Sequence, residues 1–280
     1  MDFMLSRKAQ FVKALVITLL SVAVVGFATA QTPHLTTADG PDRAPAQFDV
    51  VSIHPSDPSI QTENLNYDPG WLRAQGITLS FLLQSAYNMK DFQIQGLPSQ
   101  LKDKKYDIAA RMLDPSSEAT WQLSNPQVRS ARERLYQKRI QNILETRFGL
   151  KYHMATKKGK ILVLRKSSQQ FKVAATEGRE DYLRMHNVEG GMQIDGKNQT
   201  MDALASELSY VFHSLVKNET GLPGRYDFLF SWRTDDAVAT DTNLPDISTA
   251  IRDALGVKVD TVTGDVQYYV VDQIEAPSPN

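Results

Sequence analysis

The sequence predicts an α+β protein in which helices pack on antiparallel strands and hairpins, with two similar halves related by internal duplication. A Gly-Leu-Pro turn followed by a Tyr-Asp pair occurs at residues 96–107 and again at residues 221–227. In both places a strand-like run and a helix of apolar periodicity come before the turn, and a helix ending at a glycine comes after it. This repeated order predicts the two halves.

The start of the chain predicts export. Residues 1–30 have basic residues, a short apolar run and a small-residue cleavage site, the pattern of a secretory signal peptide. An uncleaved anchor is the alternative, and only this segment would then contact a membrane. Residues 31–47 are rich in Thr, Pro, Asp and Ala and are predicted to be a disordered spacer. We therefore expect an exported protein of the periplasm or the extracellular space.

The composition excludes some kinds of chemistry. The chain contains no cysteine, so disulfides, thiolate nucleophiles and thiolate metal ligands are excluded. A formal net charge of −1 at pH 7 does not supply the concentrated Lys and Arg that neutralise phosphates, so nucleic acid is not an expected partner.

The first αβ half is assigned to residues 48–165. A β-prone run at residues 48–53 is expected to be a strand that is stopped by His54-Pro55, because proline removes a ladder donor. Residues 56–70 are expected to form a polar loop, and Thr78 can cap the helix that follows through its hydroxyl. Shorter strands are expected at 72–76 and 93–95, and a helix at 81–89.

The longest helix is the best marked element of this half. Asn125 is a suitable N-cap, Pro126 fits the first helical position, and Gly149 can adopt the left-handed conformation that ends a helix. A hairpin is then expected across residues 157–159. Charged residues on the other face of the long helix are expected to be solvated, with the binding of an anionic partner as the alternative; they are Arg129, Arg132, Glu133, Arg134, Lys138 and Arg139.

The second αβ half is assigned to residues 191–275, after a polar connector at 166–190. A clean apolar stripe predicts a helix at 201–215, and Gly256 follows a last helix. The fold is expected to close with a hairpin over residues 263–264. Residues 276–280 are expected to be a frayed tail.

No reactive constellation stands out in the sequence. The five histidines are scattered without a ligand-pair spacing, so no metal site is predicted, and no catalytic residue or cofactor is predicted either. Four aspartates gather near residues 235–246 and could offer oxygens to calcium, but the loop lacks the spacing of a calcium loop and a solvated acidic loop is the preferred interpretation. These aspartates are Asp235, Asp236, Asp241 and Asp246.

The recurring Tyr-Asp pairs have a structural and a functional interpretation. Asp can accept backbone hydrogen bonds and Tyr can pack its ring, which is the preferred interpretation. Alternatively, a seam between the two halves would bind a ligand, and the aromatic residues nearest the Gly-Leu-Pro turns would line it. The predicted ligand-binding residues are therefore Tyr106, Tyr226 and Trp232, although all three could equally be core.

Several motifs resemble the exported proteins of unknown function that are abundant in soil Acidobacteria. The similar segments are residues 48–55, 78–87, 147–153, 220–228 and 271–280, and together they cover nearly all of the chain after the spacer. Two positions depart from the family pattern: Leu101 stands where Trp is usual, and Asn218 where Asp is usual. The resemblance implies export and a similar fold, and it supplies no reaction or ligand.

The expected function is a non-catalytic binding or interaction module of the cell envelope, with an unknown protein or envelope component as partner. The sequence leaves catalysis open. The alternative is a hydrolase of cell-wall or extracellular polymer that uses carboxylates such as Asp107, Asp227 or Glu207. A third possibility is a purely structural envelope component.

Overall fold

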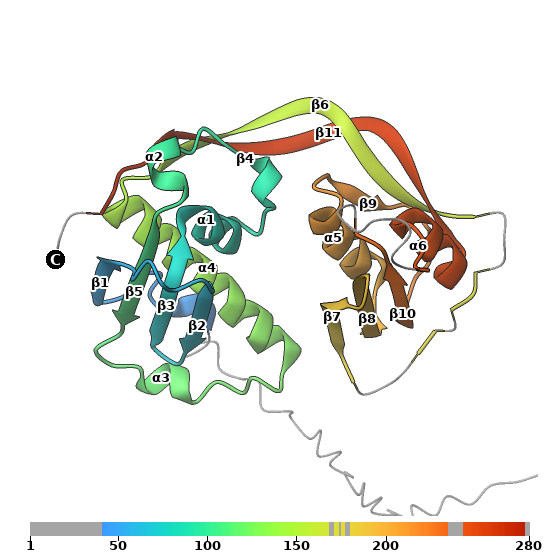
Figure 1. Ribbon diagram of the computed structural model, residues 1–280. Helices are drawn as coiled ribbons and strands as arrows, with labels where there is room; N and C mark the ends of the chain where they lie inside the picture. Colours follow the sequence, from blue (N-terminus) through green and yellow to red (C-terminus); the bar gives the residue numbers. More distant parts are fainter. Residues whose placement is uncertain (1–40, 168–170, 174, 177–179, 235–242, 278–280) are drawn as a thin grey trace, which may run out of the picture. The chain divides into compact units, whose positions relative to one another are not determined.

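The computed structural model describes residues 41–167, 171–173, 175–176, 180–234 and 243–277 (Figure 1). Helices accompany three sheets in which antiparallel pairing predominates, so the predicted α+β class is confirmed. The predicted signal peptide at 1–30 lies outside the described residues. Within those residues, no helix combines the length and the apolar character needed to cross a membrane.

The first sheet has the strand order β1-β5-β3-β2 and is antiparallel throughout. Helix α1 follows β3 directly, and α4 is the long helix of this region (Figure 1). One hydrophobic core joins the sheet to both helices. The elements are η1 (Pro41–Arg43), β1 (Val50–Pro55), β2 (Asn64–Asp68), β3 (Trp71–Thr78), α1 (Leu79–Tyr87), η2 (Asp91–Gln93), α2 (Ser99–Lys102), β5 (Lys105–Arg111), α3 (Ser116–Ala119) and α4 (Pro126–Arg147).

The second sheet has the order β10-β8-β7 and is also antiparallel. Helices α5 and α6 pack with it around a second hydrophobic core. The elements are β7 (Tyr182–Val188), β8 (Gly191–Gln199), α5 (Met201–Val211), β10 (Tyr226–Trp232) and α6 (Ile247–Leu255).

Two long strands form a ribbon in place of the two predicted hairpins. β6 (Lys151–Lys166) pairs antiparallel with β11 (Val257–Gln273) along its length, and the two run side by side in Figure 1. The predicted turn glycines, Gly159 and Gly264, face each other within this ribbon. A side chain at Gly264 would meet the Ile161 side chain at 2.4 Å, so this glycine permits close packing and forms no turn.

Short strands extend the ribbon at two places. β4 (Ile94–Gln95) pairs parallel with β11, and β9 (Val216–Asn218) pairs parallel with β6. The ribbon also contributes side chains to both hydrophobic cores. Leu164 of β6 belongs to the second core, whereas Val271 of β11 and Ile274, which follows β11, belong to the first. Each core therefore contains side chains from a distant part of the sequence.

The helix ends follow the predicted capping chemistry. Thr78 Oγ1 accepts the Phe81 N–H at 3.2 Å, and Thr200 Oγ1 accepts the Ala203 N–H at 3.1 Å. Asn125 caps α4 in the same way, accepting from Gln127 at 2.9 Å. After α4, Gly149 has a φ of +62°, the left-handed conformation that favours glycine.

Some elements differ from the sequence predictions. β1 continues through Pro55, which an edge strand tolerates. β2 lies within the predicted loop 56–70, and β7 lies within the predicted connector 166–190. Residues 41–47 of the predicted spacer are structured, because Pro45 O accepts a hydrogen bond from Arg139 Nε at 3.0 Å. The rest of that spacer lies outside the described residues.

Candidate ligand pocket

A cavity of about 690 Å³ opens where β1 ends and β5 begins. Its volume lies in the range of roughly 300–1,000 Å³ typical of small-molecule sites. The wall combines apolar side chains with a few polar ones. It consists of Ile53, His54, Pro55, Ser56, Pro58, Gln61, Asp103, Lys104, Lys105, Tyr106, Ala276 and Pro277.

Strand pairing places the central residues of this wall. Pro55 lies opposite Tyr106 in the β1–β5 ladder, and the Ser56 N–H donates to Lys105 O at 2.9 Å. The Tyr106 ring packs edge-on against Phe148, with 5.3 Å between the ring centroids. The Glu275 N–H donates to Phe148 O at 2.8 Å, which holds the chain beside the cavity just before Ala276 and Pro277.

Two buried hydroxyl groups of the wall have no hydrogen-bond partner among the described residues. They are Tyr106 Oη and Ser56 Oγ. A buried polar group without a partner costs about 1–3 kcal/mol, and most such groups in folded proteins are paired. Burial raises the pKa of Tyr106, so the phenol keeps its proton at neutral pH and can donate it. Both atoms are buried beneath the surface of the cavity, so a molecule in the cavity does not reach them in this structure.

Charged side chains border the same cavity. Lys105 Nζ donates to Ile60 O at 2.9 Å and is fixed by this bond. Lys104 and Asp103 are exposed, and Lys104 makes no ion pair with any described residue. His54 Nε2 lies 2.8 Å from Ser52 Oγ. The two lysines against one aspartate give this wall a small positive excess.

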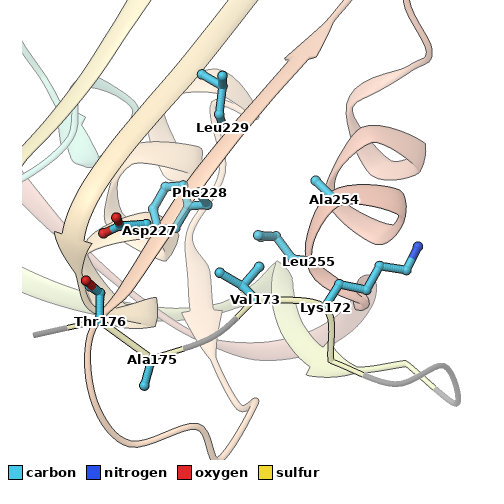
Figure 2. Close-up of a pocket in the computed structure, with 9 residues that line it drawn as sticks. All are labelled: Lys172, Val173, Ala175, Thr176, Asp227, Phe228, Leu229, Ala254 and Leu255. Carbon is cyan, nitrogen blue, oxygen red and sulfur yellow. The ribbon is translucent and has the colours of Figure 1, made fainter.

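A second cavity, of about 410 Å³, lies beside β10 and α6 (Figure 2). Figure 2 shows Asp227 and Thr176 on one side and Lys172 on the other, with its ammonium end turned away from them. The Asp227 carboxylate is already occupied, since it accepts from the Asn198 N–H at 2.9 Å and from Lys197 Nζ at 3.1 Å. This cavity is smaller than the cavity at Tyr106, and Lys172 Nζ, like the Asp227 carboxylate, already has a protein partner, since it donates to Asp253 O at 2.8 Å.

The three aromatic residues predicted to bind a ligand are buried. Tyr106 is 3% exposed and belongs to the first core, whereas Tyr226 (5%) and Trp232 (3%) belong to the second. Tyr226 Oη donates to Pro223 O at 2.7 Å, and Trp232 lines a third cavity of about 410 Å³. Only Tyr106 therefore combines a cavity with a free hydroxyl. The predicted seam between the halves stays a prediction.

The aspartates of the Tyr-Asp pairs have matched structural roles. Asp107 Oδ1 accepts the Gly76 N–H at 2.8 Å, and Asp227 Oδ1 accepts the Asn198 N–H at 2.9 Å. Gly76 and Asn198 have φ values of +63° and +55°, and each lies at or beside an irregularity in the strand register. The prediction that Asp accepts backbone hydrogen bonds here is confirmed.

The described residues contain no group of three or more His, Cys, Asp or Glu side chains that could hold a metal ion. Of the predicted acidic loop, Asp246 is described and caps α6 by accepting from the Thr249 N–H at 3.0 Å. Asp235, Asp236 and Asp241 lie outside the described residues.

Sequence reasoning missed Ser56, Ala276 and Pro277 as parts of a site. Ser56 was assigned to a polar loop, and the other two to a frayed tail. The apolar residue Ile274 could have indicated their position. Because Ile274 is buried in the first core, the residues that follow it must lie close to that core.

Fold and site together define an α+β protein with a cavity suited to a small molecule. Residues 80–274 match the family model described as "Protein of unknown function (DUF3738)", more than half of the chain, so the protein belongs to this family. No curated protein and no solved structure matches the chain significantly. The family description states no activity, source or location.

Proposed function

We propose that the protein is an exported, non-catalytic binding module of the bacterial cell envelope, and that its ligand occupies the cavity at Tyr106. One observation carries the proposal: the cavity has the volume of a ligand site, and its wall combines three prolines with the exposed charged side chains of Asp103 and Lys104. Export is supported by the pattern of residues 1–30.

The environment of the candidate carboxylates argues against the hydrolase alternative. Asp107 and Asp227 lie on β5 and β10, in different sheets, and each accepts a backbone N–H. The hydrogen bond from Asn198, with a further contribution from Lys197, lowers the pKa of Asp227. A general acid at neutral pH requires a raised pKa, so Asp227 is poorly suited to that role.

A thermal-shift screen of the purified protein with small amphipathic molecules tests the proposal. Because a ligand at about 100 times its Kd adds roughly 2.7 kcal/mol, it should raise the Tm by roughly 5–10 °C. The shift should shrink in Ala276→Trp, whose larger side chain fills part of the cavity, and persist in Glu275→Trp, a matched variant at a neighbouring exposed position that does not line the cavity.

Turnover assays on peptidoglycan and polysaccharides provide the opposing test. Reproducible hydrolysis that is lost on replacing Asp107, Asp227 or Glu207 would overturn the proposal in favour of the enzyme. Stable association of the protein with an insoluble envelope fraction, without any ligand-induced shift, would favour the purely structural class.

We also propose that the two αβ segments arose by internal duplication. Supporting this, a strand pair, a capped helix, a short parallel strand, a Tyr-Asp strand and a helix followed by a long strand occur twice in the same order. The Asp-to-bulge bonds of Asp107 and Asp227 repeat as well. In an experimental structure, superposing residues 71–165 on 191–274 should place Tyr106 on Tyr226; a failure to do so would contradict the duplication.

A further inference from the structure

One face of the first sheet is open to solvent. In β3, Leu72 and Ala74 belong to the first core, whereas Arg73 between them is exposed. In the central strand β5, the same alternation leaves Ala109 and Arg111 exposed. Because successive side chains of a strand point to opposite faces, these exposed residues share the face of the sheet that is turned away from the core.

Strand pairing brings an aromatic ring and two cations together on this open face. Trp71 of β3 lies opposite Arg111 of β5, and Arg73 lies opposite Ala109, so the two arginines occupy diagonal positions on neighbouring strands. The Arg73 guanidinium carbon lies 5.7 Å from the centroid of the Trp71 ring, which is partly exposed. Ala109 has a short side chain and adjoins both arginines, whose guanidinium groups stay exposed.

Arg73 and Arg111 form no ion pair with any described residue. The open face of the second sheet differs, because its polar side chains pair with one another. The pairs are Lys197 Nζ with Asp227 Oδ2 at 3.1 Å, Gln193 Nε2 with Ser231 Oγ at 2.8 Å and Tyr182 Oη with Asp195 Oδ2 at 3.1 Å. The first sheet therefore presents two guanidinium groups that a partner can engage.

The side chains of this face favour a sugar that carries a carboxylate. A guanidinium group forms two parallel hydrogen bonds with a carboxylate, which is the partner that Arg73 and Arg111 favour. The flat Trp71 ring favours a surface of C–H groups, such as one side of a sugar ring. The Asn66 amide, opposite Arg73 on β2, can donate to and accept from hydroxyl groups.

Two carboxylates on the same face disfavour a uniformly anionic partner. Asp68 lies opposite Trp71 and its side chain is 62% exposed, and Asp107 precedes Ala109 by two residues on β5. Both would repel the closely spaced phosphates of a nucleic acid or of an anionic lipid surface, but both can accept hydrogen bonds from sugar hydroxyls. Four strands, each roughly 4.8 Å from the next, also give a broad platform that suits an extended polymer.

We infer that the open face of the first sheet binds an acidic polysaccharide. Arg73 and Arg111 pair with carboxylates of the polymer, and the Trp71 ring lies against one of its sugar rings. These three residues do not line the cavity at Tyr106, so the inference adds a second binding surface and does not depend on a ligand in that cavity.

Oligogalacturonate and its methyl ester test the role of charge, because esterification removes the negative charges and keeps the sugar chain. Binding to the purified protein is followed by calorimetry at low salt. Oligogalacturonate should bind at least about tenfold more tightly than the ester, and added NaCl should weaken it, since exposed ion pairs are screened by salt. Oligomers of alginate and of hyaluronate extend the test to other acidic sugar polymers.

Arginine variants test the surface itself. Arg73→Gln and Arg111→Gln should each weaken oligogalacturonate about two- to fivefold, the value of one exposed ion pair. Arg184→Gln is the matched control and should bind as the wild type does. Arg184 is an exposed arginine opposite Asp195 on the open face of the second sheet, 4.4 Å from the Tyr182 ring centroid. Urea midpoints equal to that of the wild type would show that each variant is folded.

Equal binding of the ester, or full affinity in the variant that combines Arg73→Gln with Arg111→Gln, would overturn the inference. Tighter binding of single-stranded DNA or of phosphatidylglycerol vesicles would overturn it too, and would assign the face to a nucleic acid or to a membrane. If none of the three acidic sugar polymers binds, the inference is wrong, whereas a ligand found in the thermal-shift screen would still support the cavity at Tyr106.

Discussion

At the scale of single residues, Arg139 of α4 is the largest fully buried side chain among the described residues. It is 0% exposed and pairs with Glu118, which is 3% exposed; Arg139 Nη1 lies 3.2 Å from Glu118 Oε2. That same carboxylate accepts the Gly70 N–H at 2.8 Å, and the guanidinium lies 4.8 Å from the Phe48 ring centroid. The buried charges of Arg139 and Glu118 therefore compensate each other, and both groups have further partners beside the first core.

Replacing Arg139 by Met should cost about 3–5 kcal/mol of unfolding free energy, because Glu118 would remain buried without its cation. Arg134→Met is the control on the same helix. Its partner Asp42 lies at 3.5 Å, but the Arg134 side chain is 57% exposed, so we expect a loss of at most about 1 kcal/mol. Urea unfolding measures both, and equal losses would contradict a structural role for the buried pair.

The sequence placed Arg139 on a solvated face, and this prediction was wrong. Helical periodicity identifies the apolar stripe of α4, but it does not show which charged side chain meets a buried partner from another element. Glu118 comes from the short helix α3, which carries no strong pattern of its own. The free hydroxyl of Tyr106 was unpredictable for the same reason, since a missing partner depends on every neighbouring segment.

At the scale of elements, local signals predicted helices better than strand pairing. The caps at Thr78 and Asn125 and the end of α4 before Gly149 were all predicted, because capping depends on neighbouring residues. β6 and β11 were each predicted to fold back as a hairpin, because glycine usually marks a turn. Each strand instead pairs with a partner far along the chain, which local patterns do not show.

The irregularity in the β8–β10 pairing, where Asp227 accepts the Asn198 N–H, predicts a stability that depends on pH. The hydrogen bond from Asn198, and then Lys197, lowers the pKa of Asp227 in the folded protein. Because the unfolded value is about 3.9, this stabilisation is fully present above that pH and is lost as the pH falls through the folded pKa. Asp227→Asn should therefore be less stable than the wild type at pH 6, with a smaller difference at pH 3.

Urea unfolding at the two pH values measures this difference. A gap between Asp227→Asn and the wild type that stays constant from pH 6 to pH 3 would show that the carboxylate charge does not support the bulge. Asp265→Asn serves as the control, since the Asp265 carboxylate is 56% exposed and pairs with Lys158 on the ribbon.

At the scale of the whole molecule, the ribbon makes each core depend on a remote segment. Ile274 follows β11 and is 6% exposed within the first core, whose other members, apart from Val271, all precede Lys151 in sequence. Ile274→Ala should cost about 2–5 kcal/mol, a core-sized loss from a position near the end of the sequence.

The neighbouring Gln273 provides the comparison. Its side chain is exposed, so Gln273→Ala should change stability by no more than about 0.5 kcal/mol. Chemical unfolding of the two variants distinguishes a core role from a frayed tail. If Ile274→Ala were as mild as Gln273→Ala, the last described residues would not belong to the core.

The ribbon also determines the order in which the two cores can be completed during synthesis, because β11 and the residues after it contribute side chains to the first core. Domains generally fold as units while the chain is being made, the N-terminal one first. Here Val271 and Ile274 reach the first core only after every residue of the second core has been synthesised. A chain that is truncated before Val271 therefore lacks two side chains of its earliest-made core, and the apolar surface that they cover stays exposed.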